Sequence, residues 1–97
     1  MTRYRLQGVE FEWDEEKALT NVQKHQIRFE EAAEVFFDPF YAEQDASQNY
    51  EDRDAIIGYS MSQRLLFVVY TERVESRIRI ISARVATTSE RRLYEGQ

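Results

Sequence analysis

Residues 64–84, RLLFVVYTERVESRIRIISAR, constrain the fold more than any other stretch, because they predict two β-strands joined by a short polar turn. The first strand, residues 65–70, is an unbroken apolar run rich in β-branched and aromatic side chains, which suit a pleated surface. Apolar residues at both parities predict a central strand that needs cover on both faces. One layer of helices covers only one face. A partner chain or a substrate then covers the other, unless the N-terminal strand or the last helix folds across it.

The second strand of this hairpin, residues 77–81, alternates in character. Ile78 and Ile80 point one way, whereas Arg77 and Arg79 point the other. The hairpin therefore predicts a sheet with an apolar back and guanidinium groups on its front. Such a front either stabilises a surface or holds an anion.

The length and the amino-acid composition fit one globular domain, residues 1–97. The chain has 97 residues, of which 42% are apolar, and it contains no cysteine, so it offers neither disulfides nor thiolate chemistry. No run approaches the roughly 18 apolar residues of a membrane span, and the N-terminus lacks a signal-peptide pattern. We therefore expect a cytoplasmic protein without a membrane partner.

Charge is distributed unevenly along the chain. The net charge is −5, but residues 1–63 hold 6 Lys and Arg against 14 Asp and Glu (−8), and residues 64–97 hold 7 against 4 (+3). Positive charge is therefore concentrated on the hairpin and the tail. This distribution fits either a mixed, solvated surface or a local site for an anion.

Two helices are predicted in the N-terminal half. Asp14 is a suitable N-cap for a helix ending near Lys24 or His25, with an inner stripe of Ala18, Leu19 and Val22. A second helix starts at Phe29 and is stopped by Pro39, and its spacing of i, i+3, i+4 and i+7 predicts four buried residues: Phe29, Ala32, Ala33 and Phe36.

The remaining elements are strands and one short helix. Residues 9–13, 40–43 and 55–59 predict strands, and Thr87 to Glu90 forms a capping box that starts a short C-terminal helix. The predicted fold class is α+β: two N-terminal helices packed on one face of an antiparallel sheet of about four to five strands.

Among chemistries, metal catalysis fits poorly, because one histidine and scattered acids give no ligand cluster. We expect neither a metal nor another cofactor. Metal-free RNA cleavage fits better, since it needs a base, an acid and cations for the developing phosphorane charge. The candidates for proton transfer are His25 and Glu72, and the candidate cations are Lys24, Arg73, Arg79 and Arg84.

Several of these candidates have alternative structural roles. His25 could form a core hydrogen bond at a helix end, and Glu72 could pair with Arg73 or Arg77. Arg84 has the parity of Ile78 and Ile80, so regular pleating directs it to the helix side. There it pairs with a buried acid such as Asp14, unless a β-bulge redirects it to the front.

Two blocks of sequence resemble the BrnT family over about residues 9–95. The first block comprises Phe11-Glu12-Trp13-Asp14, Lys17, Asn21, Lys24-His25, Phe29-Glu30-Glu31-Ala32, Val35-Phe36 and Asp38-Pro39. The second comprises Val69-Tyr70-Thr71-Glu72-Arg73, Ile78-Arg79-Ile80-Ile81-Ser82-Ala83-Arg84, Glu90-Arg91-Arg92 and Tyr94.

This resemblance implies a RelE-like ribonuclease toxin of a type II toxin–antitoxin pair, which cleaves RNA and halts growth when free. It implies a BrnA-like antitoxin as partner, contact with operator DNA only through that antitoxin, and a homodimer within the complex. On this interpretation the catalytic residues are His25, Glu72, Arg79 and Arg84, with RNA held by Lys24, Arg73 and Arg77. The alternative is a non-catalytic binding module that acts only in complex assembly and operon control.

Overall fold

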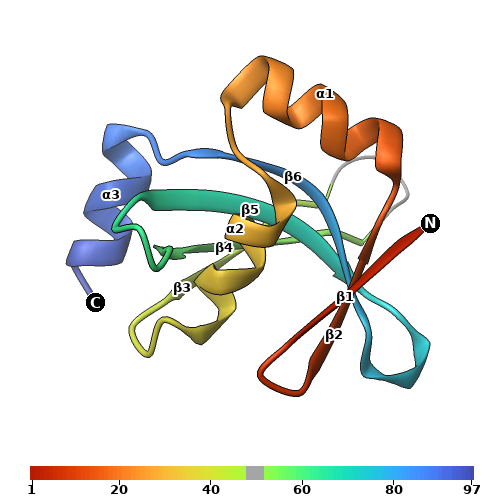
Figure 1. Ribbon diagram of the computed structural model, residues 1–97. Helices are drawn as coiled ribbons and strands as arrows, with labels where there is room; N and C mark the ends of the chain where they lie inside the picture. Colours follow the sequence, from red (N-terminus) through yellow and green to blue (C-terminus); the bar gives the residue numbers. More distant parts are fainter. Residues whose placement is uncertain (48–51) are drawn as a thin grey trace.

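The computed structural model describes residues 1–47 and 52–97. Over these residues the chain runs β1 (Thr2–Leu6), β2 (Val9–Trp13), α1 (Glu15–His25), α2 (Phe29–Glu34), a 3₁₀ turn (Val35–Phe37), β3 (Ala42–Asp45), β4 (Asp54–Tyr59), β5 (Leu65–Glu72), a second 3₁₀ turn (Val74–Ser76), β6 (Ile78–Val85) and α3 (Thr88–Glu95) (Figure 1). The α+β class and the short C-terminal helix are confirmed. No helix of the described residues is long and apolar enough to cross a membrane.

The sheet is larger than predicted, and it is mixed. Within the described residues it has six strands in the order β1-β2-β6-β5-β4-β3. All neighbours are antiparallel except β2 and β6, which run parallel with Glu12 opposite Arg79. The predicted antiparallel sheet of four to five strands is therefore wrong, because residues 2–6 form an additional strand that pairs with β2.

A tight turn explains why β1 forms. Gln7 and Gly8 both have positive φ, 49° and 82°, as a two-residue hairpin turn with the correct twist requires. Glycine takes this conformation without cost, so Gly8 was the sequence signal for the hairpin.

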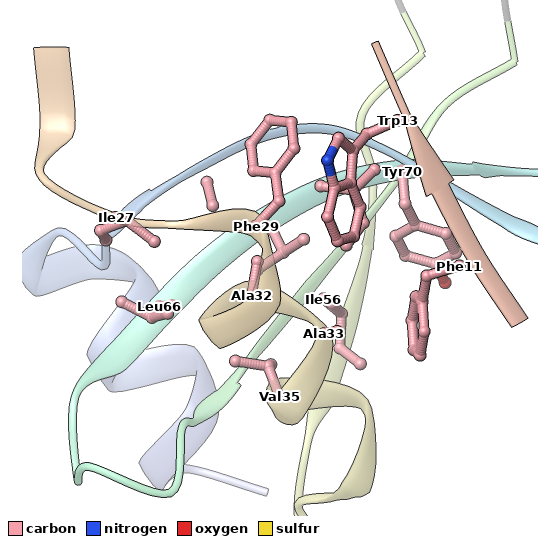
Figure 2. Close-up of a cluster of buried hydrophobic side chains, with 13 residues drawn as sticks. Phe11, Trp13, Ile27, Phe29, Ala32, Ala33, Val35, Ile56, Leu66 and Tyr70 are labelled. Atoms are coloured by element: carbon pink, nitrogen blue, oxygen red, sulfur yellow. The ribbon is translucent and has the colours of Figure 1, made fainter. Parts of the chain in front are cut away.

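The main core lies between α2 and the sheet (Figure 2). The predicted α2 pattern is confirmed for Phe29, Ala32 and Ala33, which are buried, while Phe36 is partly buried at the edge of the cluster. Phe11 and Trp13 of β2 contribute the large rings on the sheet side, and Trp13 packs edge-on against Phe29 at 5.7 Å between ring centroids.

The predicted inner stripe of α1 is confirmed for Ala18, which is partly buried against the main core, and wrong for Leu19 and Val22. Leu19 and Val22 are 62% and 37% exposed, and the one buried residue of α1 is Asn21. Its side-chain amide accepts from the Ala83 N–H (3.0 Å) and donates to the carbonyls of Ala83 and Ile27 (2.9 Å each). The helix thus docks on the edge of β6, beyond the short segment paired with β2, by supplying the hydrogen bonds of a missing strand.

The other face of the central strand is covered at one end by α3. Tyr94 of α3 packs with a small cluster around Ile57 and Leu65. The predicted capping box is present, since Thr87 and Glu90 bond each other's backbone N–H groups. The predicted cover by the last helix is therefore present at one end of this face. The rest of the face carries the candidate site.

Candidate active site

Arg79 lies on the face of β6 opposite the main core and shares a buried carboxylate with Arg77. Glu12, which is 3% exposed, accepts from Arg79 Nε (2.8 Å) at one oxygen and from Arg77 Nε (3.0 Å) at the other. The parallel register of β2 and β6 sets this contact, because it places Glu12 beside Arg79. Burial alone would raise the pKa of Glu12, but the hydrogen bonds and charges of Arg79 and Arg77 outweigh burial and lower this pKa.

Arg84 reaches the same face because a β-bulge breaks the alternation of β6. Val69 is opposite Ser82 and Tyr70 is opposite Ile80, so Ile81 has no counterpart on β5. Of the two alternatives for Arg84, the bulge is confirmed and pairing with Asp14 is wrong, since Asp14 caps α1 by accepting from the Lys17 N–H.

Two contacts fix the Arg84 guanidinium. It forms a bidentate pair with Glu90, with both N–O distances at 2.8 Å, and its Cζ lies 4.3 Å from the centroid of the Phe67 ring. The hydrogen bonds that Arg84 donates to Glu90 raise the pKa of Arg84 further, so the group stays charged.

Three hollows adjoin one another around this face. The His25 hollow is lined by Asp14, Glu16, Lys17, Thr20, Asn21, Lys24, His25, Arg53, Ile81 and Ser82. The Arg79 hollow is lined by Lys17, Asp52, Arg53, Thr71, Glu72, Arg73, Arg79 and Ile81. The Phe67 hollow is lined by Gln44, Asp45, Ala46, Ser47, Arg53, Phe67, Val69, Ser82, Arg84 and Glu90. Because lining residues are shared, the three hollows are neighbours, and we call them together the groove.

The groove brings together six of the seven predicted site residues: Lys24, His25, Glu72, Arg73, Arg79 and Arg84. The seventh, Arg77, lines none of the three hollows. Its side chain is 19% exposed and pairs with Glu12 and Glu75. Arg79 is paired with Glu12, but its side chain is still 29% exposed and lines the Arg79 hollow.

Sequence reasoning missed three residues that line the groove, and a fourth, Glu12, that pairs with Arg79. Glu12 had a signal, since alternation on β2 puts it opposite Phe11 and Trp13. Lys17 and Asn21 share a helix face with Lys24, but only the docking of α1 shows that this face meets β6. Arg53 had no signal, because distant segments bring it to the groove.

Among the described residues, no three His, Cys, Asp or Glu side chains are grouped so as to hold a metal ion. The donors that the groove does offer are guanidinium, ammonium and imidazole groups, which suit an anionic ligand.

The fold and the groove together define a small α+β protein that presents cations on the part of a sheet face left uncovered by helices. Residues 13–90 match the model of the ribonuclease toxin BrnT of type II toxin–antitoxin systems, and the chain belongs to this family. Membership of a type II toxin–antitoxin family implies an antitoxin partner.

A solved structure supports the fold. The chain is similar to the ribonuclease toxin BrnT of Brucella abortus, whose crystal structure superposes with a TM-score of 0.58 at 22% sequence identity. The similar region covers 78% of this chain and 94% of that one. A comparison with curated protein sequences gave no match.

Proposed function

We propose that this toxin is a metal-independent endoribonuclease that cleaves RNA by attack of a ribose 2′-hydroxyl on the adjacent phosphorus. Arg79 and Arg84 stabilise the phosphorane charge, and His25 and Glu72 transfer protons. The observation that carries the proposal is the assembly of six candidate side chains around one groove, although they come from α1, β5, β6 and the segment between the last two strands.

The chemistry needs no group beyond these side chains. A base takes the 2′-hydroxyl proton as the 2′-oxygen bonds to phosphorus, and an acid protonates the departing 5′-oxygen as its bond to phosphorus breaks. The products are a 2′,3′-cyclic phosphate and a 5′-hydroxyl. Guanidinium groups match the equatorial phosphate oxygens in geometry and charge, so they stabilise the transition state where charge develops.

The proposal extends to RNA binding and to the partner. Lys24, Arg73 and Arg77 hold the RNA backbone, and a BrnA-like antitoxin neutralises the toxin. We further propose a RelE-like helix arrangement, a cytoplasmic location, and a toxin homodimer within a complex that meets operator DNA only through the antitoxin. Of these points, the family description supports the antitoxin partner, because its members are toxins of type II systems.

The decisive experiment incubates purified toxin with RNA in the presence of EDTA. We expect cleavage at an undiminished rate, with 2′,3′-cyclic phosphate ends, and no cleavage of RNA whose 2′-hydroxyls are methylated. Loss of cleavage with EDTA, restored by a divalent cation, would overturn metal independence. Growth assays with and without the neighbouring open reading frame test neutralisation by the antitoxin.

A second candidate, a non-catalytic module for complex assembly and operon control, is favoured by one observation. The guanidiniums of Arg79 and Arg84 are both paired internally, with Glu12 and Glu90. This candidate predicts that the purified protein leaves RNA intact and that expression alone is harmless.

A further inference from the structure

Arg53 is shared by the three hollows of the groove. Of the described residues, it is the one that lines all three hollows. The three hollows around Arg53 hold the predicted catalytic groups. His25 lines one, Glu72 and Arg79 line the next, and Arg84 lines the third. An RNA strand that reaches all of these groups must therefore pass Arg53.

The backbone of Arg53 is fixed in place. Its carbonyl accepts from the Ala46 N–H at 2.9 Å and from the Ser47 hydroxyl at 3.3 Å, while its N–H donates to that hydroxyl at 3.2 Å. These bonds lie next to the β3–β4 ladder, which ends with Asp45 opposite Asp54. The side chain thus starts from a defined point at the sheet edge and is half-buried.

The charge around Arg53 differs between hollows. The Arg79 hollow is lined by four cationic side chains and two acidic ones, an excess of positive charge. The Phe67 hollow is balanced in charge, with Arg53 and Arg84 against Asp45 and Glu90. Its apolar members are Ala46, Phe67 and Val69. Phosphate favours the first environment, whereas the apolar surface of the second suits an unstacked base.

We propose that the substrate is a single-stranded RNA segment that crosses from the Arg79 hollow to the Phe67 hollow, and that Arg53 binds a backbone phosphate at the crossing. This inference rests on the proposed function and adds to it a binding residue and a path for the strand. Arg53 contacts the substrate without taking part in proton transfer. Its loss therefore weakens binding and leaves the chemical step unchanged.

The test measures binding of a short single-stranded 2′-O-methyl RNA at several salt concentrations. Each phosphate contact contributes a slope of about −0.7 to the plot of log affinity against log salt for single strands. Arg53→Gln should reduce the slope by about that amount and weaken binding about 5-fold at 0.1 M salt. With cleavable RNA the same variant should raise KM with little change in kcat.

Arg28→Gln is the matched control. It also removes one positive charge, but Arg28 lines none of the three hollows, and its side chain is 71% exposed with a loose 3.6 Å pair to Glu30. Arg53→Lys keeps the point charge, so it should retain the wild-type slope, and this result applies even if Arg53→Gln fails to fold.

The outcomes separate the two proposals. If the wild type cleaves RNA but Arg53→Gln has the slope and KM of Arg28→Gln, the inference is overturned and the proposed function stands. A reduced slope for Arg53→Lys would overturn it as well. If the wild type neither binds nor cleaves RNA, the proposed function itself fails.

Discussion

The two arginine sites on the open face differ in how their charge is compensated. In the Glu12 cluster, Arg77 and Arg79 share one buried carboxylate. In the Glu90 pair, Arg84 has a carboxylate of its own, held by two bonds of 2.8 Å, and lies over Phe67. Apart from the exposed Glu75, which also pairs with Arg77, the cluster has two guanidiniums for one carboxylate, and the Glu90 pair is neutral.

This difference suggests different relations to an incoming phosphate. The phosphate adds an anion beside Arg79, whose buried carboxylate partner Glu12 is shared with Arg77. At the Glu90 pair it competes with a carboxylate that is already bidentate, so the gain is smaller. Arg79 should therefore contribute more to the transition state than Arg84.

The largest expected effect comes from removing these guanidiniums. Arg79→Ala should lower kcat for RNA cleavage by roughly 10³-fold, and Arg84→Ala by about 10²-fold, because each deletes a charge aimed at the developing phosphorane. Both losses should appear as reduced toxicity on expression in bacteria, with Arg28→Ala as control. Full toxicity of both variants would remove these residues from the site, and a larger loss for Arg84→Ala would reverse the comparison.

Loss of the carboxylate should destabilise the folded protein more at the Glu12 cluster than at the Glu90 pair. Glu12→Gln leaves Arg79 without an anion and leaves Arg77 only the exposed Glu75, so it should cost about 1–3 kcal/mol. This cost is less than that of a fully buried pair because both arginines are partly exposed. Glu90→Gln should cost about 1 kcal/mol, since the amide still caps α3. Urea unfolding measures both, and equal costs would show that the sharing of Glu12 by two arginines is unimportant.

Acid should weaken the Glu12 cluster. A carboxyl group with a lowered pKa in the folded state binds more protons when unfolded, so its contribution is complete above its ordinary pKa and is lost as pH falls. The Glu12→Gln variant should therefore lose stability less steeply than wild type below about pH 4.5, by at most about 1.4 kcal/mol per pH unit. Unfolding curves between pH 5 and 2 measure this, and parallel curves would contradict it.

A reference for that experiment lies outside the groove. The Glu31 carboxylate of α2 accepts from Arg64 and from the hydroxyls of Ser60 and Ser62. The Arg64 bonds have the largest effect and lower the pKa of Glu31 to about 2. Its contribution is thus lost between about pH 4.5 and about pH 2, and Glu31→Gln should remove it while leaving RNA cleavage intact.

The smallest effect is expected at the edge of the Glu12 cluster. Glu75 pairs with Arg77 at 2.8 Å but is 76% exposed, and such pairs contribute little in water. Glu75→Ala should leave the free energy of unfolding within about 0.5 kcal/mol of wild type. A larger loss, measured by urea unfolding, would mean that Glu75 and Glu12 share the compensation of Arg77.

Local signals predicted much of the fold. The Asp14 cap, the apolar spacing of α2 and the box at Thr87 each depend on contacts within a few residues, and each is present. The α1 stripe failed at Leu19 and Val22 because helical spacing identifies an apolar face without showing what meets it. Here α1 docks through Asn21 on a strand edge, and Leu19 and Val22 remain exposed.

Strand alternation is a property of the backbone, so residue order alone was enough to place Arg79 on the face opposite Ile78 and Ile80. The partners that the cations meet depend on how the whole chain packs. The bulge at Ile81 turned Arg84 to the open face, the parallel register put Glu12 beside Arg79, and the packing of distant segments brought Arg53 to the groove. These contacts join residues far apart in the chain, and their geometry follows from the packing of the whole sheet.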